Sequence, residues 1–276
     1  MTRGTTALYK PEDVISLIAV EEERVVVEER AEVRQITRGS LLLTETIHCS
    51  GLVWCQSQMR GGQPLVEVVR LGLVSYQEAL RLQQVYVNRH RSSPAHALLL
   101  CEHPPVYTTG IRHKPYPEPL LDRLRLLGAN VHRANRGGLI TFHGPGQLVC
   151  YPVLNLCSFK KSVRWYVDQL EQTVIALCSR FAIQATTSPH TGVWVGDNKI
   201  CAIGIHCGRY ITSHGLALNC CTDLSWFDHI VPCGIEGKGV TSLSAELRRH
   251  ASVEEVVPHL LHAFTQQFNC QLTEAA

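Results

Sequence analysis

The sequence has 276 residues, of which 45% are hydrophobic and 18% charged, and its formal net charge is +2 at pH 7 with histidine neutral. These values are typical of a folded globular protein with a substantial core, and the weak net charge argues against nucleic acid as a partner. The longest apolar runs, such as Ala97 to Cys101, are far too short to span a bilayer, so no membrane partner is expected.

Twelve cysteines are spread along the chain without a single C-x-x-C pair. Zinc sites usually contain such close pairs, so we expect no structural metal, and no motif indicates a cofactor. Cys101, His103, His206 and Cys207 form an alternative metal-ligand set, but their spacing matches no recognised site. The first thirty residues carry acidic side chains and no apolar stretch of the secretory type, so most thiols are expected to be reduced and buried.

Residues 1–63 differ in pattern from the rest of the chain, with an acidic stretch followed by Ser-, Thr- and Gly-rich sequence. We interpret them as an N-terminal extension that is poorly ordered and lies outside a compact domain over residues 64–276. Met59 is the only methionine after Met1, so an alternative start there is also open.

From Pro64 onward the hydrophobic pattern becomes regular. Ser75 with Glu78 and Ser252 with Glu255 have the spacing of capping boxes, each placed before an apolar repeat of helical period. Strands and helices intermix without a clean βαβ repeat, which predicts an α+β domain with a mixed sheet flanked by helices. The expected elements are a strand over 65–74, a helix over 75–90, a strand over 95–102, a helix over 117–128, two strands over 137–156 broken by a Gly-Pro-Gly turn, a helix over 162–181, a β-rich segment over 191–220 with a hairpin turn at 196–198, and a helix over 252–268.

Three glycine-rich clusters are candidates for a functional site. In the first, residues 136–147, glycine lets the backbone approach a ligand closely and an arginine and a histidine supply polar anchors, although a plain glycine-rich hairpin would give the same pattern. In the second, Lys199 follows a turn and precedes a strand in which small residues, Ala202 and Gly204, leave space. A lysine beside a turn is usually solvated, whereas one held near such a space would be partly desolvated.

The third cluster contains Cys233 between Pro232 and Gly234. The proline restricts the backbone before the cysteine and the glycine frees it afterwards, so this sulfur is expected at a corner of the chain. A corner suits a nucleophile, while a buried structural thiol is the alternative.

The motifs of these clusters occur together and in order. They are Arg136-Gly-Gly, Thr141-Phe-His-Gly-Pro-Gly-Gln-Leu, Thr191-Gly-Val-Trp-Val, Lys199-Ile, Ser213-His-Gly-Leu-Ala-Leu-Asn and Pro232-Cys-Gly. In this set the chain resembles the lipoyl(octanoyl) transferase family, and in particular its animal mitochondrial members, from Pro64 to the C-terminus. The resemblance implies the fold of biotin and lipoate protein ligases, a mixed sheet flanked by helices.

The resemblance also implies an activity and its partners. Members of this family move an octanoyl group from acyl carrier protein to a lysine of a lipoyl domain, the first step of endogenous protein lipoylation, without a cofactor. The implied acceptors are the lipoyl domains of 2-oxoacid dehydrogenase complexes and the glycine cleavage H protein, and the implied location is the mitochondrion. The resemblance places catalytic roles on Cys233 and Lys199. It places substrate binding on Arg136, Gly137, Gly138, Leu139, Ile140, Thr141, Phe142, His143, Ala202, Ile203, Gly204, Gly215, Leu216 and Ala217.

The residue chemistry fits this activity. Attack on a thioester requires a thiolate, and a nearby lysine ammonium favours the ionised form of Cys233. Lys199, once it has lost its proton, could act as a general base for the incoming lysine amine. The alternatives are an ATP-dependent lipoate- or biotin-type protein ligase, which needs no nucleophilic cysteine, and a non-catalytic module that binds lipoyl domains or acyl carrier protein.

Overall fold

A large mixed β-sheet forms the centre of the protein. The computed structural model describes residues 62–90, 92, 95–112, 116–234 and 237–275. Within them the main sheet has eight strands in the order β10-β8-β9-β6-β2-β1-β11, with β7 paired to β8. Its centre is antiparallel, while β2–β1, β1–β11 and β8–β10 are parallel pairs. The strands are β1 (Leu65–Leu73), β2 (His96–Glu102), β6 (Gln147–Val153), β7 (Val193–Val195), β8 (Asn198–Gly208), β9 (Ile211–Asn219), β10 (Gly239–Val240) and β11 (Gln271–Glu274).

A smaller sheet lies beside the main one in the order β4-β3-β5. It consists of β3 (Val106–Thr109), β4 (Asn130–Arg133) and β5 (Thr141–His143). The two strands predicted around the Gly-Pro-Gly turn are both present, but they belong to different sheets, because the chain crosses there from β5 to β6. The turn pattern predicts a reversal of the chain but does not say which sheet each strand joins.

The crossing is firmly anchored at Gly146. Its backbone has φ +78°, a conformation that favours glycine. Its N–H donates to Glu102 Oε2 at 2.6 Å, and its carbonyl accepts from the backbone N–H groups of Cys220 and Cys221 and from the Thr222 hydroxyl. The segment between the sheets is therefore tied both to β2 and to the chain that follows β9.

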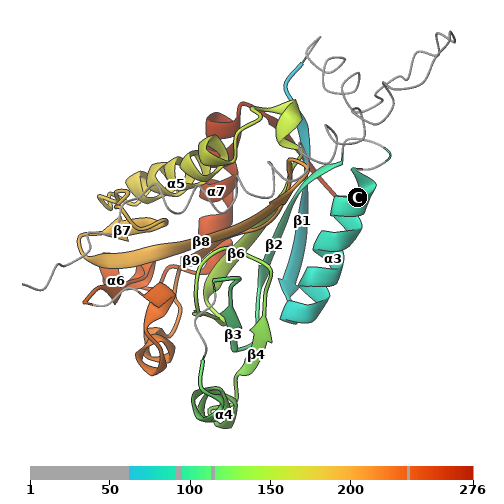
Figure 1. Ribbon diagram of the computed structural model, residues 1–276. Helices are drawn as coiled ribbons and strands as arrows, with labels where there is room; N and C mark the ends of the chain where they lie inside the picture. Colours follow the sequence, from blue (N-terminus) through green and yellow to red (C-terminus); the bar gives the residue numbers. More distant parts are fainter. Residues whose placement is uncertain (1–61, 91, 93–94, 113–115, 235–236, 276) are drawn as a thin grey trace, which may run out of the picture. The chain divides into compact units, whose positions relative to one another are not determined.

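Helices cover both faces of the main sheet (Figure 1). On one face α5 (Val163–Arg180) packs against α7 (Val253–Phe268), and on the other lies α3 (Tyr76–Arg89). The serine half of each predicted capping box is present, since Ser75 and Ser252 each accept a hydrogen bond from the backbone N–H three residues later, both at 3.2 Å. The carboxylates of Glu78 and Glu255 instead accept from Arg81 and Arg249. The remaining elements are α4 (Glu118–Leu126), α6 (Leu243–Leu247), η1 (Leu156–Ser158), η2 (Leu224–His229) and η3 (Pro232–Gly234).

The layers follow from the hydrophobic periods. On α5 the buried stripe of Tyr166, Leu170, Val174 and Leu177 joins the core cluster between the sheet and the α5–α7 pair. A second cluster fills the space between the sheet and α3, and a third surrounds the small sheet. The mixed α+β prediction is thus confirmed for the described residues. None of their helices is long and apolar enough to cross a membrane. Most of the predicted extension, residues 1–61 of 1–63, lies outside the described residues.

Candidate active site

Lys199 reaches the site because of an irregularity in β8. The pairing of β7 with β8 shifts between Val193 and Trp194, so that Ile200 is an extra residue on β8. Ile200 and its neighbour Cys201 are both fully buried in the cluster facing α5 and α7, which a regular strand does not allow. This bulge brings Lys199 into a pocket that Ala202 also lines, although the two residues lie three positions apart and would face opposite ways on a regular strand.

The Lys199 side chain is 7% exposed and has two defined contacts. Its Nζ donates to the Thr191 carbonyl at 3.0 Å and lies 4.8 Å from the centre of the Trp194 ring. A carbonyl oxygen and an aromatic face are both partners that suit an ammonium group. Gly192 has φ +125°, and a Cβ there would lie 3.3 Å from Nζ and 2.7 Å from the Cys201 carbonyl oxygen, so only glycine fits beside the lysine. The Thr-Gly-Val-Trp segment therefore holds Lys199 in place.

One carboxyl group lies near this lysine. Glu171 on α5 accepts the Gly192 N–H at 2.9 Å. Burial raises the pKa of Glu171 above its ordinary value, and the Gly192 hydrogen bond and, to a smaller extent, the positive charge of Lys199 oppose that rise. The contact with Gly192 connects α5 to the segment that positions Lys199.

The backbone of Cys233 lies in η3, the tight turn that the Pro-Cys-Gly spacing predicts. The Gly234 N–H donates to the Val231 carbonyl at 2.9 Å, and Gly234 has φ +67°. Pro232 lines the same pocket as Lys199, and a Cβ at Gly234 would overlap the Leu139 side chain. The turn that carries Cys233 thus lies between Leu139 and the pocket of Lys199.

Two adjoining pockets make up the site. We call the first the lysine pocket; it is lined by Thr141, Gln147, Lys199, Ala202, Ala217, Asn219, Phe227, Pro232 and Val240. We call the second the large pocket, and its empty space is about 450 Å³ with its open mouth included. It is lined by Tyr76, Arg136, Gly137, Gly138, Thr141, His143, Val149, Tyr151, Ala202, Ile203, Gly204, His214, Gly215, Leu216 and Ala217. The two pockets share Thr141, Ala202 and Ala217 and are therefore adjacent.

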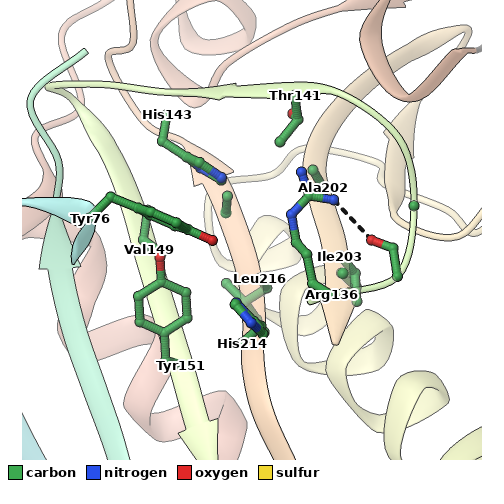
Figure 2. Close-up of a pocket in the computed structure, with 15 residues that line it drawn as sticks. Tyr76, Arg136, Thr141, His143, Val149, Tyr151, Ala202, Ile203, His214 and Leu216 are labelled. Carbon is green, nitrogen blue, oxygen red and sulfur yellow. Dashed lines mark hydrogen bonds between the residues drawn. The ribbon is translucent and has the colours of Figure 1, made fainter. Parts of the chain in front are cut away.

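Figure 2 shows Tyr76, His143 and His214 with their polar ends directed toward the large pocket. The Tyr76 ring stacks on His143 with 6.2 Å between centroids, and its hydroxyl has no hydrogen-bond partner among the described residues. Burial raises the pKa of Tyr76 to about 12. Burial also lowers the pKa of both His143 and His214 to about 3, and the charge of Arg136 adds to this effect. Both imidazoles are therefore neutral near pH 7.

His214 interrupts the alternation of β9. Its φ of +56° is uncommon in a strand and brings residues 214–217 into the wall of the large pocket in succession. Its Nε2 is 2.6 Å from Asn135 Oδ1, and its backbone N–H donates to Gln83 Oε1 at 2.7 Å. These two contacts support the strained backbone.

Most of the predicted substrate-binding residues come together around the large pocket, but three do not line it. Leu139 packs under Gly234, while Ile140 and Phe142 are buried in the core cluster of the small sheet. The alternation of β5 explains this, since Thr141 and His143 face the pocket and Phe142 faces the opposite way. The residues that do line the large pocket are Arg136, Gly137, Gly138, Thr141, His143, Ala202, Ile203, Gly204, Gly215, Leu216 and Ala217.

Gly204 does not simply open free space, as the sequence suggested. A Cβ at Gly204 would lie 3.1 Å from Arg136 Cδ and from the Gly137 carbonyl oxygen. Arg136 thus occupies the space that the missing side chain leaves. The guanidinium of this buried arginine donates to the carbonyl and hydroxyl oxygens of Thr108 at 2.8 and 2.7 Å.

Several pocket residues were not among the predicted site residues. Gln147, His214 and Asn219 lie within the motifs that carry the family resemblance, so a signal for them was present in the sequence. Tyr76 and Tyr151 lie in an ordinary amphipathic helix and an ordinary buried strand, and nothing local marks them. Among the described residues, no group of three or more His, Cys, Asp or Glu side chains could hold a metal ion.

Comparison with known proteins identifies relatives of the whole described domain. The family model for the lipoyl protein ligase A/B catalytic domain matches residues 75–265. A Danio rerio protein named octanoyl-[acyl-carrier-protein]:protein N-octanoyltransferase LIPT2, mitochondrial, is 67% identical over 211 residues, which cover 75% of this chain and 94% of the relative. A Homo sapiens protein of the same name is 53% identical over 223 residues, which cover 76% of this chain and 96% of the relative. An octanoyltransferase of Thermoanaerobacter sp. is 42% identical over 212 residues, which cover 75% and 92%.

Solved structures agree on the fold. A lipoate-protein ligase A bound with ATP superposes with a TM-score of 0.63 at 13% identity, covering 78% of this chain and 89% of that chain. A bipartite lipoate protein ligase from Thermoplasma acidophilum superposes with a TM-score of 0.60 at 14% identity, covering 78% and 87%. These likenesses confirm the predicted lipoate-ligase type of fold. The matching family model and the relatives of 42–67% identity show that the chain belongs to the lipoyl protein ligase A/B catalytic-domain family and, within it, to the lipoyl(octanoyl) transferases.

Proposed function

We propose that this protein transfers an octanoyl group from octanoyl-acyl carrier protein to the acceptor lysine of a lipoyl domain, with Cys233 as the acyl carrier and Lys199 as the proton carrier. It is a mitochondrial acyltransferase of protein lipoylation, as are the vertebrate relatives by their names. The observation that supports these roles most directly is one pocket lined by both Lys199 and Pro232, the residue before Cys233. That pocket adjoins a larger one of mixed apolar and polar lining.

The first step moves the acyl group onto the enzyme. The Cys233 thiolate attacks the carbonyl carbon of the donor thioester, and the carbonyl electron pair moves onto its oxygen. When the tetrahedral intermediate collapses, the bond to the carrier sulfur breaks and the carrier thiolate takes a proton from the Lys199 ammonium. The products are S-octanoyl Cys233, the free carrier thiol and a neutral Lys199.

The second step moves the acyl group to the acceptor. The amine of the lipoyl-domain lysine attacks the S-octanoyl carbonyl, and its surplus proton passes to the neutral Lys199 amine. Collapse of this intermediate forms the amide and releases the Cys233 thiolate. The initial thiolate–ammonium pair is thereby restored, so the cycle needs neither ATP nor a cofactor.

The pockets suit the two ends of the substrate. The lysine pocket contains the polar groups of Lys199 and Asn219 near the turn of Cys233, where the carbonyl would react. The large pocket continues from it past Ala202 and Ala217 and would take the eight-carbon chain. The carbonyl end and the hydrocarbon end of one octanoyl group would therefore occupy adjoining spaces.

The identity of the acceptor is a further part of the proposal. Lipoyl domains of 2-oxoacid dehydrogenase complexes and the glycine cleavage H protein would present the receiving lysine. One structural relative was solved in a study of an archaeal lipoylation system that includes its E2 lipoyl domain. Transfer assays with each isolated acceptor would establish which of them this enzyme serves.

An ATP-dependent ligase is the second candidate, since the fold is shared with a lipoate-protein ligase bound with ATP. The sequence relatives favour octanoyl transfer, because octanoyltransferases match at 42–67% identity and that ligase at 13%. The requirement for ATP separates the two activities. Transfer from octanoyl-acyl carrier protein in ATP-free buffer is expected at full rate.

The test of the acyl carrier is intact mass spectrometry after mixing the protein with octanoyl-acyl carrier protein. We expect the added mass of one octanoyl group on the Cys233 peptide, its loss in Cys233→Ser and its retention in the control Cys207→Ser. Stable acylation of a different cysteine in the unmodified protein would overturn the assignment to Cys233.

A further inference from the structure

A chain of buried hydrogen bonds connects the large pocket to the lysine pocket. It begins at the Arg136 guanidinium and ends at the carbonyl of Thr241, the residue whose N–H donates to the Lys199 carbonyl at 3.0 Å. The links are Arg136 Nη2 to Thr108 Oγ1 at 2.7 Å, Thr108 Oγ1 to His143 Nε2 at 3.3 Å, His143 Nδ1 to Gln147 Oε1 at 2.8 Å, Gln147 Nε2 to Asn219 Oδ1 at 2.9 Å, and Asn219 Nδ2 to Thr241 O at 2.9 Å.

Two groups with fixed roles set the direction of this chain. The Arg136 guanidinium only donates, so the Thr108 hydroxyl accepts from it. The Phe142 carbonyl only accepts, so Gln147 turns its NH₂ group there and its oxygen toward His143 Nδ1. The neutral imidazole then carries its hydrogen on Nδ1 and donates it to the carbonyl oxygen of Gln147. Burial lowers the pKa of His143 to about 3, so the ring is neutral near pH 7, and its Nε2, which then carries no hydrogen, accepts from the Thr108 hydroxyl.

The direction also fixes which way both carboxamides face. With its oxygen toward His143, Gln147 turns its NH₂ group toward Asn219 Oδ1 and the Phe142 carbonyl, at 2.9 and 3.3 Å, and uses both hydrogens. Asn219 must then turn its NH₂ group away from Gln147. One of its hydrogens goes to the Thr241 carbonyl, and the other has no acceptor among the described residues.

The spare hydrogen belongs to a side chain of the reaction site. Asn219 is 4% exposed and lines the pocket that Lys199 and Pro232 also line. A buried N–H without a protein acceptor is costly unless a ligand or water completes it. An amide held in advance toward the place where negative charge develops is a common means of stabilising an oxyanion.

We propose that the Asn219 side-chain amide donates this hydrogen to the acyl carbonyl oxygen and stabilises the oxyanion in both transfer steps. The inference rests on the proposed function, since it requires the acyl carbonyl to react beside Cys233. Because the same carbonyl is attacked first by Cys233 and then by the acceptor amine, one donor serves both intermediates. His143 and Gln147 are positioning residues that act through Asn219.

The direct test measures each step separately by rapid quench in Asn219→Ala and in the nearly isosteric Asn219→Asp. We expect acylation of Cys233 and transfer to the lipoyl domain each to slow by ~10²–10³-fold, the loss usual for one oxyanion donor. Alkylation of Cys233 by iodoacetamide displaces iodide at a saturated carbon and forms no oxyanion. In Asn219→Ala its rate is expected to stay within about threefold of the unmodified enzyme.

Gln147→Glu tests the positioning chain. The introduced carboxylate still accepts from His143 but has no hydrogen for Asn219, so the Asn219 amide should rotate and present its oxygen to the reaction site. We expect a loss similar to that of Asn219→Asp at pH 8. The loss should shrink as the pH falls, because the introduced carboxyl group, once protonated, regains an O–H that donates to Asn219. A structural defect alone would not recover on acidification.

Acylation by Asn219→Ala within about threefold of the unmodified rate would overturn the proposal. An equal fall in the rates of Cys233 alkylation and acylation in Asn219→Ala would also overturn it. The substitution would then be lowering the reactivity of the thiolate and not the stability of the oxyanion. Failure of the proposed function gives a different result, namely that the unmodified enzyme forms no S-octanoyl Cys233 at all.

Discussion

Lys199 illustrates how a single side chain depends on its immediate support. The extra residue Ile200 turns the Lys199 side chain to the face of β8 that lines the lysine pocket, and Gly192 leaves room beside the amine. From the sequence, the family motif drew attention to Lys199, but strict alternation would place it on the opposite face from Ala202. A bulge depends on the pairing of two strands, so the residue order of one strand does not reveal it.

The two roles proposed for Lys199 separate under substitution. Lys199→Arg keeps a positive charge, but a guanidinium does not lose its proton near neutral pH. We expect acylation of Cys233 to survive in part while transfer to the lipoyl domain stalls, so that the S-octanoyl enzyme accumulates. Lys199→Ala should impair both steps, with acylation recovering as the pH rises toward the ordinary pKa of a thiol. Rapid-quench kinetics measures both, and near-normal turnover by Lys199→Arg would exclude the role as base.

Gly204→Val tests whether β8 lines the acyl site. The new side chain would press on Arg136, which now fills that space, and push it into the large pocket. An octanoyl donor should then lose more rate than a butanoyl donor, since each buried methylene contributes ~0.8 kcal/mol. Gly208→Val, on the same strand but outside both pockets, is the matched control. Equal losses for the two donors would show that this strand does not contact the chain.

At the scale of elements, hydrophobic period and capping predicted most helices and strands, but not their partners. The stripe of α5 and the serine caps of α3 and α7 are local signals, and the structure contains them. The separation of β5 and β6 into two sheets is set by contacts far apart in the chain. The same reason explains the pocket residues that were missed, because Tyr76 and Tyr151 approach the site only through the packing of α3 on β6.

A chain that begins at Met59 tests the predicted domain boundary. Every described strand and helix lies at or after Leu65, and the first strand is already tied down by Gln271 N–H to the Pro64 carbonyl at 2.9 Å. We therefore expect the shortened protein to unfold cooperatively and to transfer octanoate at close to the full-length rate. Urea unfolding and the transfer assay check this together. A broad, non-cooperative transition would mean that residues 1–58 complete the core.

For the molecule as a whole, the buried histidines determine its tolerance of acid. The folded protein keeps His96, His143 and His214 neutral, with burial lowering each pKa from 6.5 to about 3. The unfolded chain takes up these protons below about pH 6.5, so acid favours unfolding through the window from 6.5 to 3. Glu171 acts in the opposite direction, because its raised pKa lets the folded protein bind a proton more readily than the unfolded chain does. It is one group against three histidines.

The expected loss is large compared with ordinary stability. Each of these histidines costs about 2 kcal/mol at pH 5, or roughly 6 kcal/mol for the three, within a typical total of about 5–15 kcal/mol. Urea unfolding followed by tryptophan fluorescence between pH 8 and pH 5 measures the change. Burial also lowers the pKa values of His90 and His103, so in His96→Gln the slope of unfolding free energy against pH below 6 should become shallower by less than a third. An unchanged slope would show that His96 is not held neutral.

The anchored crossing at Gly146 has a consequence for how substrates are distinguished. Because hydrogen bonds tie this segment to β2 and to the chain after β9, we expect the walls contributed by the two sheets to keep their separation when a substrate binds. Their conformational entropy is lost during folding and not during binding, so the cavity is preorganised. Such a cavity discriminates between acyl groups by how well each chain fits a space that is already formed before the chain binds.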